Sequence, residues 1–129
     1  MKSRRSDLEG RADAVMVDAP CSGTGTWRRN PEARWRLDEG ELTRLTVLQD
    51  RLIDIAAAMV KPGGRIGFVT CSLLDAEGKD RIAAALERHP QLKPMDIALP
   101  LGRAHGAGIR LSPLHDGTDG FFVAMLRAG

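Results

Sequence analysis

Two cysteines and one aspartate follow apolar runs in this sequence, and their residue types could do chemistry together. The stretch DAPCSGTG places Asp18 and Cys21 directly after the apolar run 14–17, and Cys71 follows a second apolar run fifty residues further along. A thiolate adds readily to electron-poor ring carbons, and a carboxylate can hold and polarise a heterocycle. Each residue alone has a simpler explanation, because free cysteines are often buried filler and a strand-end aspartate often caps a turn. Together the three favour nucleophilic chemistry on a heterocyclic substrate.

Two other uses of these cysteines find less support. A cysteine hydrolase needs a histidine near one thiol, and none of the three histidines has a spacing that nominates it. The two cysteines form no CxxC pair, so they indicate neither a zinc site nor a disulfide framework.

No apolar run approaches the ~20 residues of a membrane span, and the N-terminus lacks a secretory signal. We therefore expect a cytoplasmic protein with free thiols and no membrane contact.

The elements that position these residues alternate between strands and helices. Asp38 is a candidate N-cap, and apolar residues at helical spacing predict an amphipathic helix over 40–60. A second helix is expected from a cap at Asp75 to about Arg88. The expected strands are 14–17, 65–72, a weaker one at 95–99, and 120–126, with a long loop over 100–120.

This order predicts an α/β fold in which the first two strands are parallel, because a helix joins them. Ligand sites in open parallel sheets lie beyond the carboxyl ends of the strands. Asp18, Cys21 and Cys71 each occupy such an end, so we expect them on the same rim of the sheet.

Two neighbouring segments could contact a nucleic acid. Ser22–Gly25 could cradle a phosphate, although the segment lacks a P-loop lysine and a full GxGxxG pattern, or its small residues could admit a substrate close to the backbone. Segment 27–36 interleaves arginines with two tryptophans, which suits phosphate contacts and base stacking; a solvated loop with one docked tryptophan is the alternative. The net charge of +2 permits nucleic-acid binding without implying it.

The motifs in order resemble one known family. DAPCSGTG, WRRNPEARWRL, a leucine-rich helix, KPGGRIGFVTCS and GTDGFFVAML together resemble the RNA cytosine-C5 methyltransferases of the Sun/Fmu type, from about Ala12 to Leu126. The resemblance implies the C-terminal half of a Rossmann-like, S-adenosylmethionine-dependent catalytic domain. Its sheet would be mostly parallel with a final antiparallel strand. Residues 1–11 would be a polar lead and residues 12–129 a partial catalytic domain.

By the same resemblance, Cys71 would be the nucleophile that adds to C6 of cytosine, and Cys21 would assist release of the methylated product. Asp18 would contact the cytosine edge and, with Pro20, face the cofactor. Arg28, Arg29, Arg34 and Trp35 would bind RNA, and the segment that holds them favours a ribosomal RNA substrate. The residues alone do not rank the two thiols, because DNA cytosine-C5 methyltransferases use the Pro-Cys cysteine as nucleophile.

Two departures from the family pattern affect the expectations. The family's Glu-Asn-Glu cluster corresponds here to Ala76–Asp80, which weakens any role for that stretch, and no glycine-rich cofactor loop precedes residue 12. The strand at 13–17 would then have an unpaired edge, which predicts self-association or pairing with a missing N-terminal half. Such a chain is expected to be inactive alone. The alternative is a non-catalytic, truncated α/β module that binds RNA.

Overall fold

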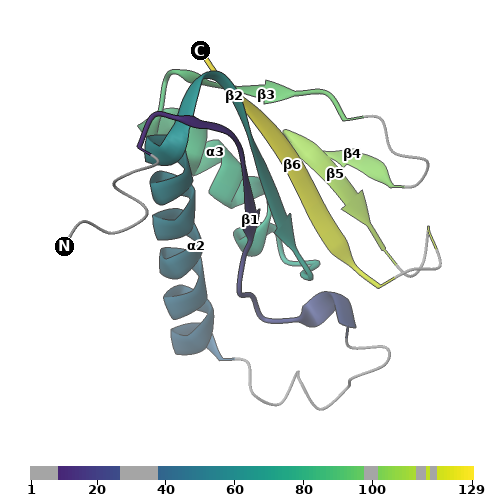
Figure 1. Cartoon of the computed structure of the whole chain (residues 1–129). Coiled ribbons are helices and arrows are strands. Elements are labelled where there is room, and N and C mark those ends of the chain that lie inside the picture. Colours follow the sequence, from purple (N-terminus) through teal and green to yellow (C-terminus); the bar gives the residue numbers. More distant parts are fainter. Residues whose placement is uncertain (1–8, 27–37, 98–101, 113–115, 117–118) are drawn as a thin grey trace.

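The protein is a mixed β-sheet with its helices packed on one face (Figure 1). The structure, a computed structural model, describes residues 9–26, 38–97, 102–112, 116 and 119–129. The strands are β1 (Ala12–Asp18), β2 (Val60–Thr70), β3 (Leu92–Met95), β4 (Arg103–His105), β5 (Gly108–Leu111) and β6 (Phe121–Ala128). The helices are α2 (Glu39–Met59) and α3 (Lys79–Arg88), and short 3-10 turns are η1 (Thr24–Thr26) and η3 (Asp75–Glu77).

The strand order is β1-β2-β6-β5-β4, with β3 also paired to β6. β1 and β2 are parallel, and Asp18 lies opposite Val69, so both strands reach the same edge of the sheet. β6 is antiparallel to β2, and its other edge carries β3 and β5 one after the other. β1 therefore ends the sheet in the part of the chain that the structure describes.

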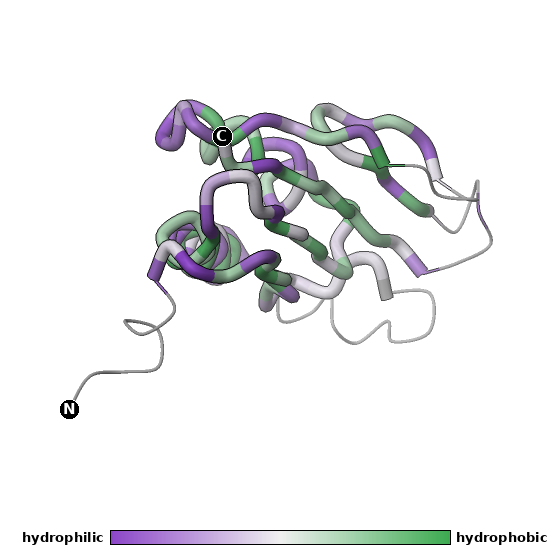
Figure 2. The backbone as a smooth tube through the Cα atoms, turned by 45° about the horizontal axis from the view of Figure 1, so that its top comes forward, coloured by the Kyte–Doolittle hydropathy of each residue, from purple (hydrophilic) through white to green (hydrophobic). Residues whose placement is uncertain are grey.

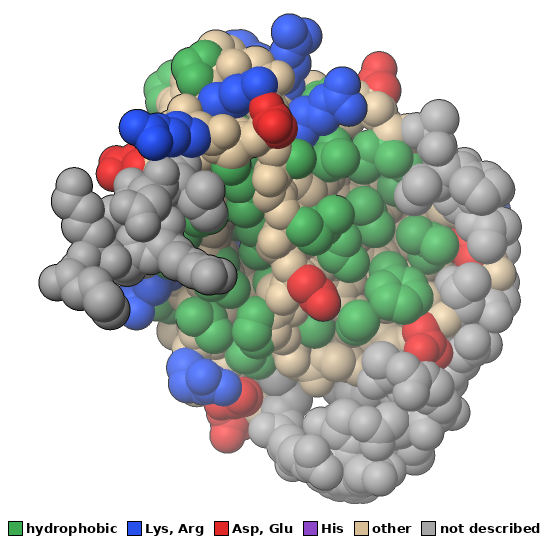
Figure 3. Space-filling view, in the orientation of Figure 1, with side chains coloured by type: hydrophobic (Ala, Val, Ile, Leu, Met, Phe, Trp, Pro, Cys, Tyr) green, Lys and Arg blue, Asp and Glu red, His purple; other side chains and the backbone are tan. Residues whose placement is uncertain are grey.

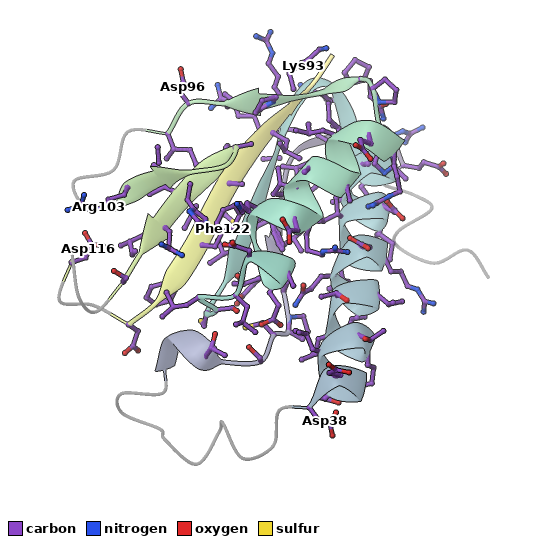
Figure 4. All side chains as sticks on the ribbon, turned by 180° about the vertical axis from the view of Figure 1, so that it is seen from behind. Asp38, Lys93, Asp96, Arg103, Asp116 and Phe122 are labelled. Atoms are coloured by element: carbon purple, nitrogen blue, oxygen red, sulfur yellow. The ribbon has the colours of Figure 1, made fainter. Side chains whose placement is uncertain are left out.

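Helices α2 and α3 cover one face of the sheet and enclose the core with it. Asp38 caps α2, since its carboxylate accepts a hydrogen bond of 2.7 Å from the Glu41 N–H. Phe122 of β6 points toward α3 (Figure 4), and its ring packs edge to face on Phe68 at 6.4 Å between centroids. Hydrophobic residues run along the central strands while polar ones gather at turns and outer helix surfaces (Figure 2). The core cluster includes Val17, Ile53, Ala56, Ile66, Phe68, Ile82, Ala85, Phe122, Ala124 and Leu126.

The opposite face of the sheet carries no helix among the described residues. Figure 3 shows hydrophobic side chains gathered over this face. A Cβ added at Gly67 would lie 3.0 Å from the Met16 sulfur and 3.4 Å from the Met125 sulfur, so both methionines lie over the backbone of β2. Met16 is 66% exposed, which is unusual for a large apolar side chain within a sheet. We call this surface, which includes Met16, Val69, Val123 and Met125, the open face.

The α/β class, the two parallel first strands, the antiparallel final strand and the Asp38 cap are confirmed. Three local predictions differ from the structure. Asp75 begins the turn η3 instead of capping the second helix, which begins at Lys79 after Gly78. The third strand lies at Leu92–Met95, earlier than the predicted 95–99. The predicted loop over 100–120 contains the hairpin of β4 and β5, joined through Gly106 and Ala107.

Candidate active site

The two cysteine-bearing loops meet at the carboxyl edge of β1 and β2, at the lower end of the sheet in Figure 1. Ladder-like hydrogen bonds continue past the strands: the Ala19 N–H donates to the Val69 carbonyl at 3.0 Å. Further out, the Gly25 N–H donates to the Cys71 carbonyl, also at 3.0 Å. The DAPCSGTG loop therefore lies directly against the Thr-Cys-Ser loop, as the parallel-strand argument predicts.

Glu77 joins these loops from the turn η3. Its side chain is fully buried, and Ser72 Oγ donates to its Oε1 at 2.7 Å. The backbone N–H of Ser22 donates to Oε2 at 2.8 Å, and the Ser22 hydroxyl also donates to Oε1. Because Ser22 follows Cys21 and Ser72 follows Cys71, one carboxylate holds the residues next to both thiols.

Helix α2 and Thr24 complete the same polar cluster. Gln49 Nε2 donates to Glu77 Oε2 at 3.0 Å and to the Pro20 carbonyl at 2.8 Å. Thr24 Oγ1 lies 3.1 Å from Ser72 Oγ and accepts from the Leu73 N–H at 2.9 Å. Buried polar groups are costly unless hydrogen-bonded, so these contacts make the joined loops rigid.

The Cys21 thiol is half-buried within this arrangement. Burial raises the pKa of Cys21, and the negative charge of Glu77 raises it further, while backbone N–H groups at Gly23 and Cys71 act in the opposite direction. Cys71 is also half-buried and unlinked to Cys21 by a disulfide. A thiol with a raised pKa carries little thiolate near neutral pH, which makes Cys21 a weak nucleophile there.

Asp18 and Pro20 lie exposed at the end of β1, beside the joined loops. An apolar groove of about 250 Å³ runs along β1 and α2, and Asp18 contributes its carboxylate among lining residues Val15, Met16, Val17, Leu52, Ile55 and Ala56. Apolar walls and one carboxylate suit an adenine ring and a sulfonium charge. Asp18 is the one charged residue in this lining, so these residues fit one side of an S-adenosylmethionine site.

The four predicted RNA contacts, Arg28, Arg29, Arg34 and Trp35, lie outside the described residues. Among the histidines, His105 Nε2 pairs with Asp75 at 2.6 Å and His89 Nε2 with Asp54 at 2.7 Å. Both histidines that the structure describes therefore bind carboxylates.

Sequence reasoning missed Glu77 and Gln49. Glu77 lies in the stretch that departs from the family pattern, and its bonding partner Ser22 is 55 residues away. A signal for Gln49 was present, because it stands between Leu45 and Ile53 on the buried stripe of α2. A polar residue on an apolar stripe requires a buried partner, and its position predicts one near the sheet edge.

The fold and the joined thiol loops define a class of protein: an α/β domain that presents two cysteines at the carboxyl edge of adjacent parallel strands. The family model described as 16S rRNA methyltransferase RsmB/F matches residues 2–127, and the chain belongs to that family. Among the residues that the structure describes, neither α2 nor α3 has the combined length and apolar character of a membrane-spanning helix.

Individual relatives agree with this family. Ribosomal RNA small subunit methyltransferase B of Thermus thermophilus is 40% identical over 118 residues, which cover 91% of this chain and 29% of that protein. The solved structure of PH0851 has 39% identity and a TM-score of 0.85, over 92% of this chain and 27% of that one. NSun6 from Pyrococcus horikoshii, solved with SFG, has 23% identity and a TM-score of 0.83, over 97% of this chain and 32% of that one, and shows the fold alone. The chain spans less than a third of the length of these relatives.

Proposed function

We propose that this chain is the catalytic segment of an RNA cytosine-C5 methyltransferase that acts on small-subunit ribosomal RNA in the cytoplasm. The observation that carries the proposal is the joining of the Cys21 and Cys71 loops on one buried carboxylate, Glu77. Family membership and the name of the Thermus thermophilus relative support the RNA substrate. Two thiols on adjoining loops suit a reaction in which one forms a covalent bond and the other assists its cleavage.

In the proposed reaction, the Cys71 thiolate adds to C6 of cytosine and forms an S–C6 bond, so that the ring electrons gather at C5. When bound, S-adenosylmethionine would supply an electrophilic methyl group, and C5 would form a bond to that methyl carbon as its bond to the sulfonium sulfur breaks. The proton on C5 then passes to a base, the ring double bond re-forms, and the S–C6 bond breaks to return its electron pair to Cys71. Covalent catalysis of this kind divides one difficult substitution into easier steps.

Cys21 is assigned to product release. Its raised pKa, which burial and the nearby Glu77 charge produce, disfavours attack by this thiol at neutral pH. The position of its loop against Cys71 suits a group that acts on the adduct. Asp18 would bind the polar edge of the cytosine and, with Pro20, form one side of the cofactor site. Arg28, Arg29, Arg34 and Trp35 would contact the RNA.

The open face and the free edge of β1 are the surfaces through which this segment would meet another one. β1 pairs only with β2 in the described sheet, and Met16 stands exposed beside that edge. The unpaired N–H and C=O groups of an apolar edge strand can form hydrogen bonds with a strand of another segment. We propose a cofactor-binding segment as that neighbour, with a second copy of the chain as the alternative occupant.

Methyl transfer from radiolabelled S-adenosylmethionine to small-subunit ribosomal RNA tests the proposal. The assay uses a polypeptide that carries this chain together with a cofactor-binding segment. We expect 5-methylcytosine in the digested RNA, none from Cys71→Ala, and normal activity from Glu87→Ala, an exposed substitution on α3. Methylation by Cys71→Ala would overturn the assignment of the nucleophile.

Calorimetry measures whether the chain by itself binds S-adenosylmethionine. Together with RNA-binding and methylation assays, it distinguishes the proposal from a self-sufficient enzyme and from a non-catalytic module. We expect no measurable binding, because the described groove fits only one side of the cofactor. Micromolar binding would instead indicate a self-sufficient enzyme. RNA binding without methylation, even in the presence of the cofactor-binding segment, would favour the non-catalytic module.

A further inference from the structure

Each cysteine of the site is followed directly by a serine, and both serines bond to the same carboxylate. Ser22 reaches Glu77 through its backbone N–H at 2.8 Å and through its hydroxyl, and Ser72 does so through its hydroxyl at 2.7 Å. The two Cys-Ser pairs come from loops fifty residues apart in the sequence. Their convergence on one side chain is a property of the folded structure.

The environment of Glu77 is built for a carboxylate. The side chain is fully buried, and its two oxygens receive four donors: a backbone N–H, two serine hydroxyls and the Gln49 amide. Four is about the number of hydrogen bonds that an ionised carboxylate can accept. Among the described residues no lysine or arginine donates to Glu77, so hydroxyl and amide groups stabilise this acidic group. Burying an acidic side chain carries a desolvation penalty in the free energy of folding, and an apolar residue of similar size would fill the space without that penalty.

The turn that carries Glu77 is itself held in place. The Thr70 hydroxyl, at the end of β2, donates to the Glu77 carbonyl at 3.1 Å. Gly78 has no space for a side chain, since a Cβ there would lie 2.9 Å from the Phe122 ring. The Thr70 hydroxyl of β2 and the Phe122 ring of β6 therefore hold the turn that carries the carboxylate. Gln49 of α2 binds the carboxylate itself.

We propose that Glu77 is a positioning residue that sets the separation of the Cys21 and Cys71 thiols by holding the serine next to each. It acts through Ser22 and Ser72 and touches neither the cytosine nor the methyl donor. The inference rests on the proposed function in one respect, because a fixed separation matters only if both thiols act on one base.

The separation of the thiols can be measured on this chain without RNA or cofactor. Dibromobimane becomes fluorescent when it bridges two thiols, and monobromobimane reports the reactivity of each thiol separately. The ratio of the bridging rate to the single-thiol rates gives the effective concentration of the second thiol near the first. A change in global stability does not alter this ratio while the protein is folded. Mass spectrometry of the peptides confirms that the bridge joins Cys21 to Cys71.

We expect Glu77→Ala to lower the effective concentration by about tenfold or more, the factor that corresponds to one hydrogen bond to a charged group. Glu77→Gln should stay within about twofold of the unmodified chain, because an amide oxygen still accepts from the two N–H donors while the hydroxyls reverse direction. The matched control Glu87→Ala removes an exposed carboxylate from α3 and should leave the ratio unchanged.

An unchanged ratio in a folded Glu77→Ala chain would overturn the inference. If that variant does not fold, the double variant Ser22→Ala, Ser72→Ala takes its place, since it removes the two hydroxyls and leaves the carboxylate. A ratio that stays unchanged in the double variant would also overturn the inference. The bridging ratio does not test the proposed function, which the methylation assay tests instead. The positioning role of Glu77 and the proposed function can therefore fail separately.

Discussion

The contact between Gly25 and Gly120 predicts that replacing Gly25 by alanine destabilises the fold, whereas the same replacement at Gly40 stabilises it. A Cβ at Gly25 would lie 2.0 Å from the Gly120 carbonyl oxygen and 2.6 Å from its carbonyl carbon. Ordinary contact begins at 3.4 Å, so one backbone segment must move by about 1.4 Å, the difference between 3.4 and 2.0. That shift would break the 2.7 Å hydrogen bond from the Gly120 N–H to the Gly25 carbonyl.

The expected cost follows from these two losses. Overpacking costs typically about 1–3 kcal/mol. The lost backbone hydrogen bond adds about 1 kcal/mol. Gly25→Ala should therefore lower the free energy of unfolding by about 2–4 kcal/mol, a large share of the ~5–15 kcal/mol typical of a domain.

Gly40→Ala is the matched control. Gly40 lies in the first turn of α2, where the nearest atom to a new Cβ is Asp38 Oδ1 at 3.4 Å. Alanine is preferred to glycine in helices, so this variant should gain about 0.5 kcal/mol. Urea unfolding followed by circular dichroism measures both changes. A Gly25→Ala variant as stable as the unmodified chain would refute the close packing of the Cys21 loop on Gly120, the residue that precedes β6.

Three further predictions concern charge and surface. Alkylation of Cys21 by iodoacetamide should have its midpoint above the ordinary thiol pKa of 9.0, and Glu77→Gln should move the midpoint to lower pH; a midpoint below 9.0 in the unmodified chain would contradict this. The hydrogen bond from His105 lowers the pKa of Asp75, so their pairing stabilises the fold above the ordinary carboxyl pKa of about 3.9 and is lost as pH falls through the lowered value. In His105→Ala the pKa of Asp75, followed by NMR, should rise, and an unchanged value would show that the pairing has no effect. Met16→Lys should reduce self-association of the chain in analytical ultracentrifugation, whereas an unmodified chain that is already a monomer would leave no association to reduce and would count against the edge prediction.

The elements around the cysteines could be predicted because local signals agreed with the fold. Asp38, a polar cap before an apolar stripe, marked the start of α2 to within a residue. The helix between the two apolar runs indicated that the two strands are parallel. Parallel strands place Cys21 and Cys71 at the same carboxyl edge of the sheet. Each of these steps uses residues that are near one another in the sequence.

The remaining features depend on distant partners or on turn chemistry. Gly106, with φ of +59°, allows the tight turn between β4 and β5, but the surrounding glycines and prolines resembled a loop. Asp75 had the residue type of a helix cap, yet Gly78, with a non-helical φ of −133° and ψ of −105°, separates η3 from α3, which begins only at Lys79. The role of Glu77 as a link between loops requires Ser22, and no local pattern connects them.

The most direct test of the central claim is a covalent RNA adduct assay on the two cysteine variants. Small-subunit ribosomal RNA, S-adenosylmethionine and a polypeptide that carries this chain with a cofactor-binding segment are incubated and then separated under denaturing conditions. If Cys71 attacks cytosine and Cys21 assists release, Cys21→Ser accumulates a protein–RNA adduct and Cys71→Ser forms none. An adduct that persists in Cys71→Ser and is lost in Cys21→Ser would reverse the two roles and contradict the account.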